Sequence, residues 1–258
     1  MTIPFFKYQG TGNDFIMIDN RHALFFKNNA KLIASLCDRR FGIGGDGLIL
    51  LENDGMSDFK MVYYNADGNE GSMCGNGGRC TVAFAKYLDI ITDTATFNAV
   101  DGPHKAIIDD KRVSLQMRDV SEIRAKPAYL FLDTGSPHHV QLVKNLKDFE
   151  VYKEGKKIRY GLYGKSGSNI NFVEQLDETT FAVRTYERGV EDETLSCGTG
   201  VTAVALAMHH TGKTAVNQVT VKTQGGDLIV EFEKDAGSYT NMYLIGPAEQ
   251  VFKGEIEC

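Results

Sequence analysis

The chain has 258 residues, of which 42% are hydrophobic and 24% charged, and its formal net charge at pH 7 is −6. A chain of this size and composition can form a buried core as one large domain or as two domains of ordinary size. It has no long apolar run and no basic stripe, so we expect neither a membrane nor a nucleic acid as partner. The opening MTIPFFKYQGTG lacks the features of a signal peptide, and we therefore expect a cytoplasmic location.

The first half of the sequence runs from β-rich segments into an unusual cysteine turn. Residues 5–19 are typical of a strand, a glycine turn and a second strand, and residues 29–40 predict an amphipathic helix that packs outside the sheet. Residues 44–68 predict a hairpin. Cys74 then precedes the glycine-rich stretch GNGG and an apolar helix, after which residues 97–117 predict short antiparallel strands.

The second half repeats this order of elements. Residues 129–143 again predict a strand, a glycine turn and a strand, and residues 164–189 predict a second hairpin. Cys197 then precedes the stretch GTG and a second apolar helix. When the halves are aligned, three pairs of positions correspond: Asn13 with His138, Gly47 with Asn169, and Asn65 with Glu187.

The repeat is about 120 residues long, too long for a solenoid, and indicates a duplicated domain. We predict one domain over 1–118 and a second over 119–246, with 247–258 returning to the first as a strand. A helix that is apolar on all sides must be buried on all sides. The predicted fold is therefore α+β, with two pseudo-symmetric domains that each wrap a barrel-like mixed or antiparallel sheet around a buried central helix.

The two cysteine turns are suited to bind a carboxylate beside an activated thiol. Free N–H groups and partial positive charge at a helix N-terminus stabilise anions, and glycines let the backbone approach them closely. The same field lowers a thiol pKa from about 8.5 toward roughly 3.5–7.5. If the two domains face one another, Cys74 and Cys197 lie on opposite sides of one carbon, which is the arrangement that inverts a stereocentre.

The remaining cysteines predict no further chemistry. The chain has five cysteines, namely Cys37, Cys74, Cys80, Cys197 and Cys258. An odd number without a CxxC pair indicates free thiols rather than disulfides, and the spacing does not fit a structural zinc site. We expect Cys37 and Cys80 to be core residues and Cys258 to be inert, and we expect no metal ligands.

Eight motifs resemble the diaminopimelate epimerase family of pyridoxal-independent enzymes, and together they run the length of the chain. They are GTGNDF (10–15), RRFGIGGDG (39–47), YYNADGNEGSMCGNGGRC (63–80), GSPHHV (135–140), NINFVE (169–174), RTYERG (184–189), SCGTG (196–200) and GPAEQVFKGEI (246–256). A lone CGTG is a weak signal, whereas the two cysteine turns combined with YERG are highly specific.

The resemblance implies a cofactor-independent isomerase that interconverts LL- and meso-2,6-diaminopimelate, a small-molecule substrate on the route to lysine or peptidoglycan precursors. By this resemblance Cys74 and Cys197 are the two acid–base residues. His138 and Glu187 polarise the thiols or hold the α-amino group. The resemblance places the substrate contacts at Asn13, Asn65, Gly75, Asn76, Asn169, Glu187, Arg188, Gly198 and Thr199.

Two positions depart from the family pattern. Gly47 stands where some members carry a side-chain amide, and Ser136 stands where the pattern has asparagine. A racemase for proline, hydroxyproline or histidine is therefore the first alternative. A non-catalytic module that binds a dicarboxylic amino acid and a thiol redox protein are two others, although a pure binder needs no cysteines and a redox protein would carry CxxC. The oligomeric state is not fixed by the sequence, and a homodimer stays open.

Overall fold

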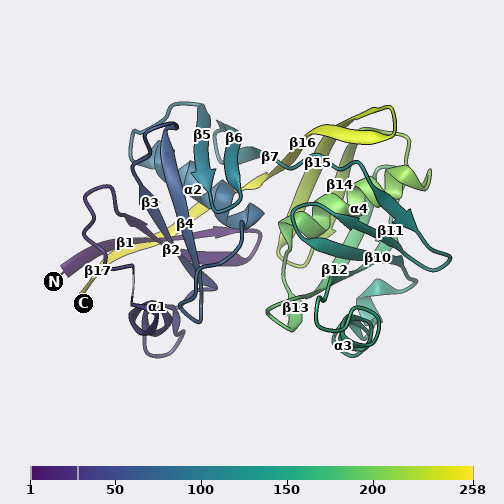
Figure 1. Ribbon diagram of the computed structural model, residues 1–258, viewed down its shortest axis with the longest axis horizontal. Coiled ribbons are helices and arrows are strands. Elements are labelled where there is room, and N and C mark those ends of the chain that lie inside the picture. The colour runs from purple at the N-terminus through teal and green to yellow at the C-terminus, as the bar shows by residue number, and fades with distance from the viewer. Residues whose placement is uncertain (1, 28, 258) are drawn as a thin grey trace. The chain divides into compact units, whose positions relative to one another are not determined.

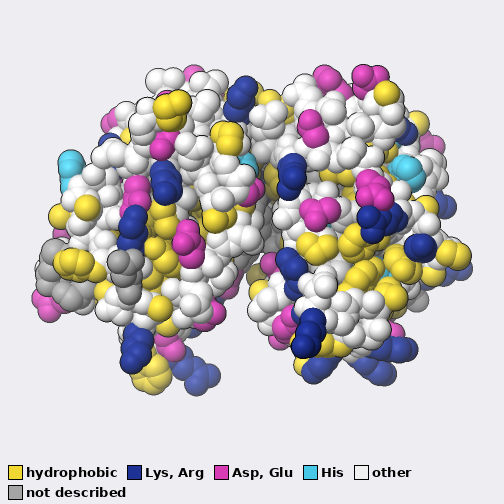
Figure 2. Space-filling model, in the orientation of Figure 1, with side chains coloured by type: hydrophobic (Ala, Val, Ile, Leu, Met, Phe, Trp, Pro, Cys, Tyr) yellow, Lys and Arg dark blue, Asp and Glu magenta, His cyan; other side chains and the backbone are white. Residues whose placement is uncertain are grey.

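The computed structural model describes residues 2–27 and 29–257, which form two compact units (Figure 1). Unit 1 comprises residues 1–115 and 246–258, and unit 2 comprises residues 116–245. None of the helices in the described part of the chain is both long enough and apolar enough to span a bilayer. Basic and acidic side chains are interspersed over the face drawn in Figure 2.

Unit 1 is one mixed sheet with two helices. Its strands, in sheet order, are β17 (Glu249–Glu257), β1 (Thr2–Gly10), β2 (Asn13–Asp19), β3 (Gly47–Glu52), β4 (Phe59–Asn65), β5 (Thr94–Ala99), β6 (Gly102–Asp109) and β7 (Arg112–Gln116). Its helices are α1 (Ala30–Cys37) and α2 (Gly75–Tyr87). From β1 onward the successive pairings are antiparallel, parallel, antiparallel, parallel, antiparallel and antiparallel.

Unit 2 repeats these pairings. Its main strands are β9 (Leu130–Asp133), β10 (Pro137–Leu142), β11 (Asn169–Gln175), β12 (Thr180–Glu187), β14 (Gln218–Thr223), β15 (Gly226–Asp235) and β16 (Ser238–Pro247). Two short strands, β8 (Ile123–Ala125) and β13 (Asp192–Thr194), pair with β9 and β12. Its helices are α3 (Val151–Gly161), α4 (Gly198–His210) and the 3₁₀ turn η1 (Leu146–Asp148). The order from β9 to β16 is antiparallel, parallel, antiparallel, parallel, antiparallel and antiparallel, as in unit 1.

The strand register gives the residue-by-residue correspondence of the two units. In unit 1, β3 sets Gly47 opposite Asn65. In unit 2, the next positions of the equivalent strands set Ile170 opposite Tyr186, so that Asn169 and Glu187 occupy the places of Gly47 and Asn65. Two of the three correspondences predicted from the sequence are confirmed by this register.

The third predicted correspondence is wrong. Phe15, and not Asn13, occupies the place of His138, because Phe15 pairs with Gly47 while His138 pairs with Asn169. The reason is the length of the turn before each strand. Six residues lie between the paired residues Tyr8 and Phe15 of unit 1, whereas five lie between the equivalent paired residues Leu132 and His138 of unit 2.

The central helices α2 and α4 lie against the inner faces of their sheets. Helix α2 contacts β1, β2, β3, β4, β6 and β17, and α4 contacts β9, β10, β11, β12, β14 and β15. From Val201 to Met208 every residue of α4 is buried, which explains why its sequence is apolar on all sides. The predicted α+β fold, with a sheet wrapped around a buried helix in each half, is confirmed.

Helices α1 and α3 pack on the outer faces of the two sheets. Ile33 and Leu36 of α1 share a cluster with Leu48 and Leu50 of β3, so this strand is covered on both faces. Helix α3 was not predicted from the sequence, because Gly155 interrupts its apolar pattern. A Cβ atom on Gly155 would lie 2.4 Å from Tyr186 Cβ, so the glycine is what allows α3 to approach β12.

Candidate functional site

The thiol of Cys74 lies at the N-terminus of α2 among two asparagine side chains. Cys74 is the N-cap residue, and its Sγ accepts a hydrogen bond from the backbone N–H of Gly77 at 3.5 Å. The thiol lies 3.5 Å from Asn13 Oδ1, to which Asn76 Nδ2 also donates at 3.2 Å. Three residues that the sequence assigned to the site are thus in contact with one another in unit 1.

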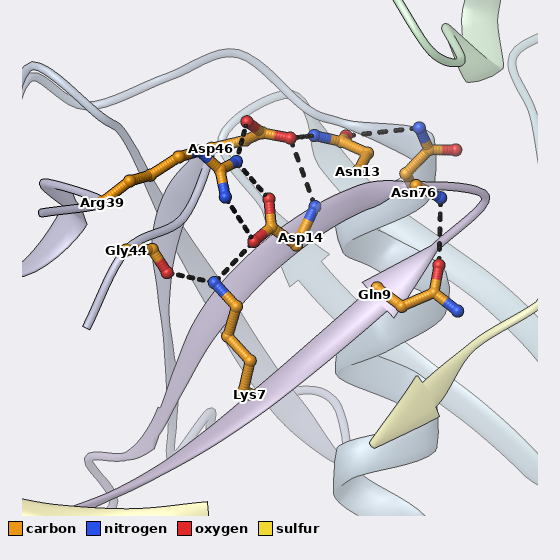
Figure 3. Close-up of polar contacts among 9 residues, drawn as sticks. Lys7, Gln9, Asn13, Asp14, Arg39, Gly44, Asp46 and Asn76 are labelled. Atoms are coloured by element: carbon orange, nitrogen blue, oxygen red, sulfur yellow. Dashed lines mark hydrogen bonds and ion pairs between the residues drawn. The ribbon is translucent and has the colours of Figure 1, made fainter. Parts of the chain in front are cut away.

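The amide of Asn13 is oriented by a carboxylate. Asn13 Nδ2 donates to Asp46 Oδ2 at 2.6 Å, and Asp46 Oδ1 in turn accepts from Arg39 at 2.7 Å (Figure 3). A carboxylate accepts hydrogen bonds and cannot donate them, so the nitrogen of the amide must face Asp46. The oxygen of Asn13 is therefore presented to Cys74 and Asn76.

Asp14 joins this cluster to the core of unit 1. Its carboxylate lies 2.6 Å from the ammonium of Lys7, which is only 5% exposed, and accepts two hydrogen bonds from Arg39. Burial alone would raise the pKa of Asp14, but the hydrogen bonds and charges of Arg39 and Lys7 outweigh it and lower the pKa to about 2. The charged cluster is a fixed support for the neighbouring Asn13.

Arg79, on α2, is fully buried and bonds only to neutral oxygens. Its guanidinium donates to Asn76 Oδ1 at 3.0 Å and to Thr11 Oγ1 and Gly75 O at 3.4 Å. Within residues 2–27 and 29–257, no carboxylate lies within ion-pair distance of it, and burial lowers its pKa to about 10. Negative charge at Cys80 or Cys74 would oppose this lowering.

Gly47 and Asn65 lie at the adjoining ends of β3 and β4. Asn65 is exposed at the end of β4, opposite Gly47. The absence of a side chain at Gly47 has a structural cause, because a Cβ there would lie 2.5 Å from the ring of Tyr63 and 2.4 Å from the carbonyl oxygen of Tyr64. The Tyr63 ring fills the space beside Gly47.

Replacing Gly47 by alanine is expected to lower the free energy of unfolding by about 1–3 kcal/mol, because the new methyl group overlaps a backbone oxygen that cannot move freely. Gly55→Ala is the matched control, since a Cβ at Gly55 meets nothing within 4 Å. Urea denaturation of both variants measures the difference. Equal stability of the two variants would contradict the close packing of Tyr63 against Gly47.

The thiol of Cys197 has a different environment at the N-terminus of α4. Cys197 is the N-cap residue, and its Sγ lies 3.6 Å from the hydroxyl oxygen of Thr199. His138 Nε2 lies 3.0 Å from the same hydroxyl. Burial and the nearby charge of Arg188 lower the pKa of the fully buried His138 to about 3, so the ring is neutral at physiological pH.

A second polar cluster in unit 2 contains Asn169 and Arg188. Asn169 Nδ2 donates to Ser136 Oγ at 2.9 Å, and its Oδ1 accepts from the backbone N–H of Arg188 at 2.9 Å. The Arg188 guanidinium lies 3.5 Å from the same serine oxygen. Ser136, which departs from the family pattern, therefore contacts two residues that are predicted to bind the substrate. The carboxylate of Glu187 accepts from Thr194 Oγ1 at 2.8 Å.

The backbone at the start of each central helix completes the predicted set. Gly75 and Asn76 open α2, and Gly198 and Thr199 open α4. In general the first N–H groups of a helix point away from its body and carry partial positive charge, which favours an anion. Each helix start thus places a thiol at the positive end of a helix.

The other cysteines differ from these two. Cys37 and Cys80 are buried, and burial raises the pKa of Cys37 to about 11 and that of Cys80 to about 12, so both stay protonated. The prediction that these two are core residues is confirmed, whereas Cys258 lies outside the described residues. The four described cysteines are free thiols.

Three polar residues that contact the predicted site residues were not predicted from the sequence. The backbone N–H of Asp14 donates to Asp46 at the start of β2, beside Asn13, and Asn171 contacts His138 through a 3.2 Å separation of Nδ2 and Nδ1. A signal for Asn171 was present, because it lies two residues after Asn169 in a strand and therefore on the same face. Asp14 lies near the start of β2 and Asp46 in the loop before β3, and only the fold brings them together.

Comparison with known proteins identifies the family. The sequence profile of the diaminopimelate epimerases matches residues 5–121 and 130–251. The chain is 62% identical over 253 residues to the diaminopimelate epimerase of Flavobacterium psychrophilum, covering 97% of this chain and 99% of that protein. It is 42% identical to the enzyme of the same name from Chlorobaculum tepidum, covering 96% and 98% of the two chains.

Solved structures share the fold at much lower sequence identity. A phenazine biosynthesis protein of the PhzF family from Bacillus anthracis superposes with a TM-score of 0.80 at 15% identity, over 100% of both chains. A hydroxyproline epimerase from Agrobacterium vitis superposes with a TM-score of 0.74 at 14% identity, over 99% of this chain and 92% of the other. With the family profile matched across both units, the chain belongs to the diaminopimelate epimerase family.

Proposed function

We propose that this chain interconverts LL- and meso-2,6-diaminopimelate without a cofactor, by moving a proton at one α-carbon between the thiols of Cys74 and Cys197. One observation carries the proposal. The N-cap position of the buried central helix is a cysteine in both units, whose strand pairings are equivalent, in a chain 62% identical to a diaminopimelate epimerase. The coarser conclusion, an isomerase that acts on a small molecule, follows from the family itself.

The chemistry follows from two acid–base groups of the same kind. A thiolate on one face of the α-carbon removes its proton, and a thiol on the other face returns one, so the configuration inverts. Negative charge builds up on the carbon and its carboxylate during transfer. Backbone N–H groups at Gly75, Asn76, Gly198 and Thr199 would stabilise that charge, and closure around the substrate would exclude water.

The remaining residues would bind the parts of the substrate that do not react. We propose that Arg188 forms a bidentate pair with the distal carboxylate, while Asn13, Asn65 and Asn169 bind the distal ammonium. This arrangement would restrict epimerisation to one end of the molecule. His138 and Glu187 would polarise the thiols or hold the α-amino group. A cytoplasmic location, a homodimer and a role in making lysine or peptidoglycan precursors complete the proposal.

In D2O, LL-diaminopimelate incubated with the purified protein is expected to acquire deuterium at one α-carbon and to yield the meso isomer, because the proton returned comes from a thiol that exchanges with solvent. Mass spectrometry measures the deuterium and chiral chromatography measures the isomers. Heat-denatured protein is the control. Meso product of the first turnovers that carries deuterium at both α-carbons, or isomer formation without any deuterium, would contradict the proposed chemistry.

Proline, hydroxyproline and histidine belong in the same assay. The substitutions at Gly47 and Ser136 motivate this comparison, because each lies at a predicted contact with the substrate. If the protein is specific for diaminopimelate, none of these three amino acids acquires deuterium. Exchange into one of them, with none into diaminopimelate, would replace the proposed substrate by that amino acid.

A further inference from the structure

Equivalent buried positions in the two units carry side chains of opposite character. Ile49 of β3 pairs with Tyr63 of β4. At the same register in unit 2, Asn171 of β11 pairs with Thr185 of β12. Ile49 and Asn171 are both fully buried. Since the fold of unit 1 forms with an apolar residue there, the polar residue of unit 2 is not a requirement of the fold.

The glycine three residues after each cysteine of the candidate site confirms that these two places are equivalent. A Cβ on Gly77 would lie 3.0 Å from Ile49 Cδ1. A Cβ on Gly200 would lie 2.5 Å from Asn171 Oδ1 and 3.4 Å from Cys197 Sγ. Asn171 thus lies directly beneath the N-terminus of the central helix, beside the thiol. Burial of a polar side chain is unfavourable unless its groups are hydrogen-bonded.

The amide of Asn171 has one orientation. Its Nδ2 donates to the carbonyl oxygen of His139 at 2.9 Å, and its Oδ1 accepts from the hydroxyl of Thr185 at 3.0 Å. A carbonyl oxygen only accepts, so the nitrogen of the amide must face His139. The second hydrogen of this nitrogen is directed to His138 Nδ1, 3.2 Å away.

This orientation settles the direction of the hydrogen bonds that lead to the thiol. Because Asn171 donates to Nδ1, the neutral ring of His138 must carry its proton on Nε2. Nε2 then donates to Thr199 Oγ1 at 3.0 Å. The hydroxyl hydrogen of Thr199 is left to donate to Cys197 Sγ at 3.6 Å.

We propose that Asn171 is a positioning residue that fixes His138 as its Nε2–H tautomer and thereby makes the Thr199 hydroxyl a hydrogen-bond donor to Cys197. The relay stabilises Cys197 as a thiolate, because a donor to sulfur favours its ionised form. Unit 1 has no such relay at the corresponding positions, where Phe15 and Ile49 stand in place of His138 and Asn171. The proposal rests on the proposed function, to which it adds a difference between the two thiols.

The tautomer is measured directly by long-range 1H–15N correlation spectra of the histidine rings. In the unsubstituted protein we expect the His138 signals to show a proton on Nε2 and a bare Nδ1. In Asn171→Ile, which places the unit 1 residue in unit 2, we expect the fixed tautomer to be lost. A proton on Nδ1 in the unsubstituted protein, or an unchanged spectrum in the variant, would overturn the proposal.

The thiolate is measured by the rate at which iodoacetamide alkylates Cys197 at pH 7, with Cys74 in the same sample as internal reference. We expect the rate for Cys197 relative to Cys74 to fall about tenfold in Asn171→Ile and in Thr199→Val, since Thr199→Val removes the hydrogen bond to the thiolate and Asn171→Ile removes the contact that directs it. Quantitative mass spectrometry of the two peptides gives both rates. An unchanged ratio of the two alkylation rates in Thr199→Val would contradict the proposed relay.

Two conservative variants separate positioning from mere support of the fold. Thr199→Ser keeps the hydroxyl, and Thr185→Val removes a buried hydroxyl from the far side of Asn171, so we expect both to change the ratio by less than about twofold. If Asn171→Ile does not fold, the Thr199 pair and the spectrum of the unsubstituted protein decide. None of these measurements uses diaminopimelate, so the relay and the proposed reaction can fail independently of one another.

Discussion

Alanine in place of either Cys74 or Cys197 is expected to lower the rate of epimerisation by a factor on the order of 1,000, because each variant lacks the acid or the base that the α-proton requires. The loss should appear in both reaction directions, since in the proposed mechanism each thiol would serve as base in one and as acid in the other. Chiral chromatography of the substrate isomers over time measures it.

Cys37→Ala is the matched control for these two variants. The Cys37 thiol is buried in a core cluster with other residues of α1 and stays protonated. The alanine variant should therefore lose some stability but keep its activity per folded molecule. Thermal unfolding of all variants separates a loss of chemistry from a loss of folded protein. Full activity in both single variants at Cys74 and Cys197 would rule out the two-thiol mechanism.

The second large effect is expected at Asp14. Asp14→Asn should lower the free energy of unfolding at pH 7 by about 3 kcal/mol, because it leaves the buried ammonium of Lys7 without its carboxylate partner. Chemical denaturation at pH 7 measures the loss. Asp109→Asn, at an exposed position of β6, is the control and should stay within about 0.5 kcal/mol of the unsubstituted protein.

The effect of Asp14 should depend on pH in a defined direction. Its pKa is about 2 in the folded protein and 3.8 ordinarily. A depressed pKa contributes stability above the ordinary value and loses it as the pH falls through the folded value, so about 2 kcal/mol of stability should disappear between pH 4 and pH 2. The stability difference between Asp14→Asn and the unsubstituted protein should therefore narrow over this interval. A difference that is constant from pH 7 to pH 2 would contradict the charge network around Asp14.

The sequence predicted those parts of the molecule that depend on local pattern and repetition. Hairpins 44–68 and 164–189, the central helices and the duplication all follow from alternating or continuous apolar residues. The correspondence of His138 could not be predicted, because it depends on the register in which the strands pair after two turns of unequal length. The pattern of helix α3 was hidden by Gly155, whose role appears only when Tyr186 packs against it.

In the candidate site, too, some residues could be predicted from local sequence pattern and others could not. Cys74 and Cys197 could be identified because each marks the start of an unusual helix. Asp46 contacts Asn13 and Asn171 contacts His138, and such contacts join segments more than 30 residues apart. Polar partners of this kind become visible only after strand register has set which side chains share a face.

Strand β17 makes the two units unequal during synthesis. Unit 2 is one uninterrupted stretch of chain, whereas unit 1 needs β17, which follows unit 2 in the sequence, to pair along the length of β1. On a ribosome the second unit therefore has all of its residues while β1 of the first still lacks its β17 partner and keeps unpaired backbone groups on that edge. The half that is translated first is the half that is finished last.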